Sequence, residues 1–193
     1  MAALARKRPP GPGGLLVPVG PVEREPLEFL RLILPETFGL EFRLHGEPLS
    51  ADPCHDPLRR QWNAGTLLQE IDEIGRRAGA ARVLGVTSFD LFIPILTFVF
   101  GLAQLGSRSA VVSLHRLWPE FYGAPADRDL LLRRLEKEVV HELGHTFGLR
   151  HCPDHACVMH YGNTVDQIDL KEAAFCPLCA PAVAAETQRI ARG

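Results

Sequence analysis

The sequence predicts one domain of the α/β class (mixed α+β), built as a twisted mixed β-sheet with an antiparallel edge strand and flanking helices. Three observations support this prediction. Strand-like and helix-like segments alternate through the first half of the chain, two strand-like runs follow each other at 97–117, and 126–148 has the pattern of a long helix. The 193 residues are enough for one domain with a sizeable core.

The first four elements follow from hydrophobic periodicity. Leu27, Leu30 and Leu34 recur at helical spacing, whereas the segments on either side of them are typical of strands. The segment QWNAGTLLQEIDEIGRRAG then places its apolar side chains on one helical face and ends among glycines. The expected order is strand, helix, strand, helix, at 15–20, 26–39, 40–46 and 61–79.

The next elements bring the chain to its long helix. An apolar, β-branched run at 81–93 predicts a strand, and the two runs within 97–117 are separated by the turn signal LGSRS, which favours an antiparallel hairpin. The helix at 126–148 begins with acidic residues at its positive end, among them Asp127, and Gly148 stands where the helix should end.

Composition restricts the class of protein. Hydrophobic residues make up 46% of the chain, charged residues 23%, and the net charge is −2, which is an ordinary globular balance. We expect neither a nucleic acid nor a membrane as partner, and the sequence does not indicate an oligomeric state. The uncharged stretch 91–105 is shorter than the roughly 20 residues of a membrane helix, and Pro94 and Gly101 favour buried strands joined by turns.

The ends of the chain and its cysteines indicate organisation and compartment. We interpret residues 1–14 as a flexible tail and 15–193 as a single domain, because the apolar run after the tail is too short for a signal peptide. Four of the five cysteines fall within 152–179. Without a secretion signal, such clustering favours metal ligation by reduced thiolates and a cytoplasmic location.

The segment HELGHTFGLRH, residues 141–151, has the spacing of a metal site. His141 and His145 are four apart on the predicted helix, so their imidazoles leave the same face and can meet at one ion. Glu142 lies beside them, where a carboxylate can accept a proton from water that a zinc ion has acidified. Two helical histidines alone could be a surface pair. Here Gly148 can turn the chain so that His151 returns as a third ligand, which is the pattern of zinc peptidases.

The cysteines after this motif form a second candidate site. Cys152, Cys157, Cys176 and Cys179 could bind zinc tetrahedrally, and the last two have the spacing of a zinc knuckle. Such a site would attach the segment after His151 to the C-terminal region. Two disulfides or unpaired buried cysteines are the alternatives.

Together these residues resemble the metzincin clan of metallopeptidases. The motif 141–151 is followed by Met159 in CVMHY, where the clan has a methionine turn. More narrowly, the cysteine directly after His151, the pair Cys157-x-Met159 and the later Cys-x-x-Cys are similar to the archaemetzincin family. The resemblance is specific over 141–179.

The resemblance implies a zinc metallopeptidase with a metzincin-like fold and two zinc ions per chain. It implies His141, His145 and His151 as ligands of a catalytic zinc, Glu142 as the general base that activates the zinc-bound water and then protonates the leaving amine, and Met159 as the base of the site. The four cysteines would hold the structural zinc. A peptide or protein substrate would pair antiparallel with an edge strand in 98–114. Aminopeptidase-like action on short peptides is favoured, and endopeptidase action stays open.

Other residues are given plainer roles. We expect Cys54 to be a loop cysteine without catalytic function, and Tyr161 to be buried against the turn, with contact to zinc or the oxyanion as its alternative. Three further histidines lack ligand spacing and are expected to be solvated or in the core: His115, His155 and His160. Two alternative functions have the same residues, namely a two-zinc binding module with little activity and hydrolysis of a non-peptide amide.

Overall fold

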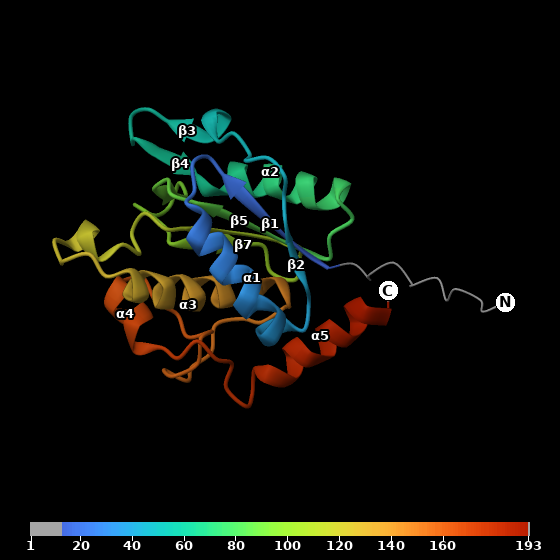
Figure 1. Cartoon of the computed structure of the whole chain (residues 1–193). Coiled ribbons are helices and arrows are strands. Elements are labelled where there is room, and N and C mark those ends of the chain that lie inside the picture. Colours follow the sequence, from blue (N-terminus) through green and yellow to red (C-terminus); the bar gives the residue numbers. More distant parts are fainter. Residues whose placement is uncertain (1–12, 193) are drawn as a thin grey trace.

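The protein, described by a computed structural model over residues 13–192, is built around a five-stranded mixed sheet (Figure 1). Four neighbouring strands are parallel, and the fifth, β7, pairs antiparallel with β8 at the edge of the sheet. In sheet order the strands are β2 (Phe42–Leu44), β1 (Gly14–Val19), β5 (Arg82–Thr87), β8 (Ser109–Ser113) and β7 (Gly101–Ala103).

A small second sheet lies beside the first. Its strands pair in the order β3-β4-β6, antiparallel between β3 and β4 and parallel between β4 and β6. Trp62 of β4 stacks on Phe89 with ring centroids 3.9 Å apart, which attaches this sheet to the loop after β5. The strands are β3 (His55–Asp56), β4 (Gln61–Asn63) and β6 (Leu91–Phe92).

Helices cover both faces of the main sheet, α2 on one face and α1 with α3 on the other (Figure 1). Because side chains alternate along a strand, neighbouring residues enter different cores: Leu16 and Val112 pack with α1 and α3, whereas Val17 and Val111 pack with α2. The helices are α1 (Arg24–Phe38), α2 (Ala64–Arg77), α3 (Arg128–Thr146), α4 (Val165–Leu170) and α5 (Ala180–Arg192).

Side-chain caps fix the start of two of these helices. The Asn63 side chain accepts hydrogen bonds from the backbone N–H groups of Gly65 and Thr66 at the start of α2. Asp127 accepts from the N–H of Leu130 at the start of α3. Each cap satisfies N–H groups that have no partner inside the helix, so the long helix begins within two residues of the predicted boundary.

The predicted fold class is confirmed, including the antiparallel edge strand and the long helix. Two details were wrong. The strand predicted at 81–93 is divided into β5 and β6 by a bend, and the stretch 91–105 is not a set of buried strands throughout, because Ile95 is 86% and Leu96 45% exposed. Over residues 13–192, no helix is both long enough and apolar enough to cross a membrane.

The N-terminal tail expected at residues 1–14 lies mostly outside the described residues. Strand β1 begins at Gly14, the last residue of the expected tail, while the rest of that tail up to residue 12 lies outside the described residues.

Candidate functional site

Three histidines converge at the C-terminal end of α3. His141 and His145 lie one turn apart on the helix, and Gly148, with φ of +88°, lets the chain leave the helix and bring His151 back. The ligand-capable atoms of the three imidazoles all lie within 4.8 Å of one another. The structure therefore brings together the three residues that the motif predicted, in an arrangement that could hold a metal ion.

The hydrogen bonds of two imidazoles determine which nitrogen is free. Nδ1 of His141 donates to the carbonyl oxygen of Val158, and Nδ1 of His145 donates to that of Leu149, both at 2.8 Å. Since a carbonyl only accepts, each neutral ring has its lone pair on Nε2. The two Nε2 atoms face each other at 3.1 Å, an arrangement that a cation bound by both lone pairs would stabilise. The donor set fits zinc.

The electrostatic surroundings of the three histidines favour the neutral form of each imidazole. Burial, followed by the positive charge of Lys171, lowers the pKa of His141 to about 3. Burial lowers the pKa values of His145 and His151 as well. Neutral imidazole is the form that binds a metal, so these side chains are ready for ligation at neutral pH without first losing a proton.

The buried carboxylate of Glu142 lies between the histidines and the edge of the sheet. A Cβ atom built on Gly101 of β7 would lie 2.6 Å from Glu142 Cγ, so only glycine allows the strand to approach this closely. Burial, and then the charge of Glu138, raises the pKa of Glu142 well above its ordinary value.

Met159 packs beneath the helical turn that carries His141 and His145. Its side chain is fully buried, and a Cβ atom on Gly144 would lie 2.4 Å from its sulfur. Gly144 therefore lets the thioether approach the helix backbone between the two helical histidines.

A cavity of about 360 Å³ opens beside the histidines. It is lined by the segment 93–103, which includes β7, by one face of α3, and by residues 161–163. Two lining residues were missed from the sequence: Glu138 and Lys171 form a buried pair. Glu138 is three residues before His141 and shares its helical face, which is a usable signal, whereas Lys171 has none.

The structure corrects the interpretation of Tyr161. Its side chain is 49% exposed rather than buried, and its ring centroid lies 5.1 Å from that of His151, at the cavity wall. Of the discounted histidines, His160 packs against His155 and hydrogen-bonds the carbonyl oxygen of Cys152, and His115 packs against an aromatic ring. None of these three belongs to the metal-capable group.

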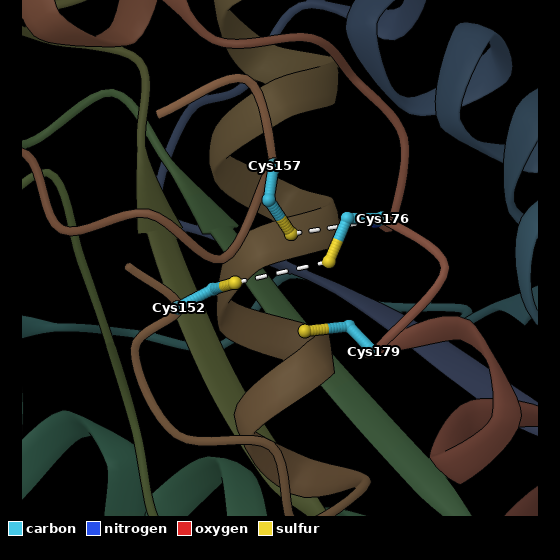
Figure 2. A group of neighbouring side chains, drawn as sticks. All are labelled: Cys152, Cys157, Cys176 and Cys179. Carbon is cyan, nitrogen blue, oxygen red and sulfur yellow. Dashed lines mark hydrogen bonds between the residues drawn. The ribbon is translucent and has the colours of Figure 1, made fainter. Parts of the chain in front are cut away.

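Four cysteine sulfurs point toward one centre (Figure 2). The sulfur atoms of Cys152, Cys157, Cys176 and Cys179 all lie within 4.8 Å of one another. All are free thiols, and the 3.8 Å between the sulfurs of Cys152 and Cys176 is far beyond a bond of about 2.05 Å. The disulfide alternative does not describe this arrangement, which could hold a metal ion.

The thiols of this cluster differ in acidity. Burial raises the pKa values of Cys157 and Cys179. Although burial opposes ionisation of Cys176 as well, hydrogen bonds from the backbone N–H groups of Cys179 and Leu178 lower its pKa to about 7. Cys54 lies in the other core, against α2, where burial and then the charge of Glu70 raise its pKa.

Comparison with known proteins identifies the family. The sequence model of Peptidase family M54 matches residues 65–185. The chain is 54% identical over 126 residues to the archaemetzincin of Thermococcus kodakarensis, covering 65% of this chain and 68% of that protein. It is 42% identical over 170 residues to the archaemetzincin of Pyrococcus furiosus, covering 86% and 88%.

Solved structures agree. The crystal structure of archaemetzincin from Methanopyrus kandleri matches with a TM-score of 0.79 at 33% identity, over 95% of this chain and 99% of that one. The protein therefore belongs to the archaemetzincins, Peptidase family M54, and is a zinc metallopeptidase that acts on peptide or protein substrates.

Proposed function

We propose that peptide bonds are hydrolysed at the histidine cluster, with His141, His145 and His151 holding the catalytic zinc and Glu142 acting as general base. The observation that supports this most strongly is the pair of Nε2 lone pairs facing each other at 3.1 Å beside a buried carboxylate. When bound, zinc supplies a Lewis acid that polarises the substrate carbonyl and lowers the pKa of water towards about 7.

Glu142 handles the proton in this proposal. Its carboxylate takes a proton from the attacking water and later gives it to the leaving amine. A pKa raised by burial and by Glu138 suits both steps, because it makes the carboxylate a stronger base and the acid easy to hold protonated until the amine departs. The contact with Gly101 holds the Glu142 side chain against β7.

Strand β7 is where an extended substrate would bind. It is the last strand of the sheet order and lines the cavity together with the histidines. A substrate backbone that pairs antiparallel with β7 would continue the sheet and pass its carbonyl groups in front of Glu142.

We assign the four cysteines to a second zinc ion with a structural role. Four sulfurs within 4.8 Å form a closed donor set with no position for substrate. This ion would join Cys152, which directly follows His151, to Cys176 and Cys179 at the start of α5. Two zinc ions per chain are expected.

The catalytic assignment is tested with a peptide-library digest of wild type beside Glu142→Gln. The matched control is Glu136→Gln, on the same helix but outside the cavity lining. We expect cleavage by wild type and by the control, and none by Glu142→Gln. Equal cleavage by all three would refute the role of Glu142, and equal absence of cleavage would favour the binding-module alternative.

Elemental analysis tests the metal assignment. We expect two zinc ions in wild type, one in His141→Ala and one in the double variant Cys176→Ser/Cys179→Ser. A single zinc in freshly purified wild type would contradict the two-site proposal.

A further inference from the structure

The cavity beside the histidines has apolar walls and a charged floor. Its charged lining residues are Glu142, Glu138 and Lys171. Glu142 acts as general base in the proposed mechanism, but Glu138 and Lys171 have no part in it. Large apolar side chains make up much of the remaining lining: Ile93, Leu96, Phe98, Phe100 and Leu102.

Glu138 and Lys171 form a buried pair with unused hydrogen-bonding capacity. They are 4% and 3% exposed, and Lys171 Nζ lies 3.5 Å from Glu138 Oε1 and donates to the carbonyl oxygen of His160 at 3.2 Å. An ammonium has three N–H donors and a carboxylate two acceptor oxygens. Among the described residues, one N–H of Lys171 and the second oxygen of Glu138 have no further partner.

Stability alone is a weak reason for such a pair. Removing two charges from water costs several kcal/mol per ion, and well-packed apolar residues often replace a buried pair without loss. Here the pair faces a cavity that adjoins the catalytic centre, so its unused donor and acceptor are available to whatever fills that cavity.

We propose that Glu138 and Lys171 determine specificity, and that they select a glutamine side chain next to the scissile bond of the substrate. This inference rests on the proposed peptidase function. A primary amide presents a carbonyl acceptor and an N–H donor side by side, which complement the N–H of Lys171 and the free oxygen of Glu138.

Both the length and the charge of the substrate side chain favour glutamine. Glu138 lies four residues, about 6 Å along the helix axis, from Glu142, and the two methylene groups of glutamine span that step better than the single one of asparagine. The formal charges of Glu138 and Lys171 cancel, so this pair would not compensate the charge of a substrate side chain buried beside it. A methionine of the same length fits the walls but leaves the donor and acceptor unpaired.

The test uses two sets of peptides, one varied at the residue before the scissile bond and the other at the residue after it. Within each set the peptides differ only at that residue, which is glutamine, methionine, glutamate or lysine. Values of kcat/KM are measured with zinc-loaded wild type, and affinities by fluorescence anisotropy with zinc-loaded Glu142→Gln. We expect glutamine to exceed each of the other three by at least tenfold in both measurements.

Two variants test whether the pair causes the preference. Glu138→Leu/Lys171→Met makes the floor apolar and should reverse the order of glutamine and methionine. Glu138→Gln keeps the shape, leaves Lys171 uncompensated and should favour glutamate, which keeps the test decisive if the double variant does not fold. Lys137→Met, which removes a lysine outside the cavity lining, should keep the wild-type order.

The outcomes separate this inference from the proposed function. Cleavage without a glutamine preference, or a preference that survives both floor variants, would overturn the inference and leave the peptidase assignment intact. Selective binding of glutamine peptides to Glu142→Gln without cleavage by wild type would refute the peptidase assignment and support the recognition. Neither binding nor cleavage would refute both.

Discussion

Gly101→Ala tests whether β7 and Glu142 are held in one fixed geometry. The added Cβ would lie 2.6 Å from Glu142 Cγ and 2.9 Å from the backbone oxygen of Val111. Val111 lies in the middle of β8 and is paired on both sides, by β5 and by β7, so it cannot yield. To restore an ordinary carbon separation of about 3.5–4.0 Å, Glu142 must retreat by roughly 1 Å.

A retreat of this size should cost both activity and stability. Misplacing a catalytic group by about 1 Å lowers rates by roughly 10²-fold, which corresponds to about 2.7 kcal/mol of transition-state stabilisation. Overpacking typically costs about 1–3 kcal/mol of folding free energy. The nearest atoms to the added Cβ belong to Glu142 and Val111 and not to a histidine, so the proposed zinc ligands should keep their places and the zinc content should not change.

The assay measures kcat/KM on a cleaved peptide, zinc by elemental analysis, and the melting temperature. Gly46→Ala is the matched control, because a Cβ there meets no atom within 4 Å and Gly46 does not have a positive φ. Activity of Gly101→Ala within twofold of wild type, with zinc retained, would refute the argument that this contact positions Glu142.

Three further predictions follow from single contacts. Gly144→Ala would place a Cβ 2.4 Å from the Met159 sulfur and should lower the free energy of unfolding by about 1–3 kcal/mol. Denaturant titration measures this loss, and the double variant Gly144→Ala/Met159→Ala should recover part of it. Hydrogen bonds, first from Arg189, lower the pKa of Glu186 to about 2, so its stabilising effect is complete above about pH 4.5 and is lost as the pH falls towards 2. Thermal unfolding is measured after a chelator has removed bound metal. Glu186→Gln should then melt at a lower temperature than wild type at pH 6, and this difference in melting temperature should vanish near pH 2. Cys179→Ser should lose one zinc ion by elemental analysis, melt at a lower temperature and keep the zinc of the histidine site.

The parts of the fold and site that depend on local patterns were predictable. The long helix follows from its periodicity and its Asp127 cap, and the convergence of the three histidines follows from the spacing of His141 and His145 with the turn at Gly148. These features need only the geometry of a helix and of its C-terminal end.

Features that depend on distant segments were not predictable. Lys171 meets Glu138 only because the chain after Met159 folds back against α3, and hydropathy does not record that contact. An apolar stretch likewise does not tell which of its side chains face solvent, which is why Ile95 was expected to be buried. Tyr161 was misjudged for the same reason, since its exposure depends on the cavity wall that it helps to form.

A short segment of chain after α3 links the two metal-capable clusters. It begins at Leu149 and ends at Val158, and these two residues provide the carbonyl groups that orient the imidazoles of His145 and His141. Hydrogen-bond acceptors of this kind fix the tautomer and direction of a ligand, and their loss typically weakens metal binding by about 10–100-fold.

Cys152 and Cys157 lie within that same segment, between the two carbonyl groups. If the four cysteines hold zinc as proposed, the structural ion fixes the segment at two points and thereby fixes both carbonyl groups. Loss of that ion in Cys179→Ser should then weaken zinc binding at the histidines by up to about 10–100-fold. Binding should not be abolished, because the hydrogen bond from the Cys152 N–H to the carbonyl oxygen of Met159, at 2.9 Å, still closes the turn. The second cluster would thus serve the first by holding the backbone that aims its ligands.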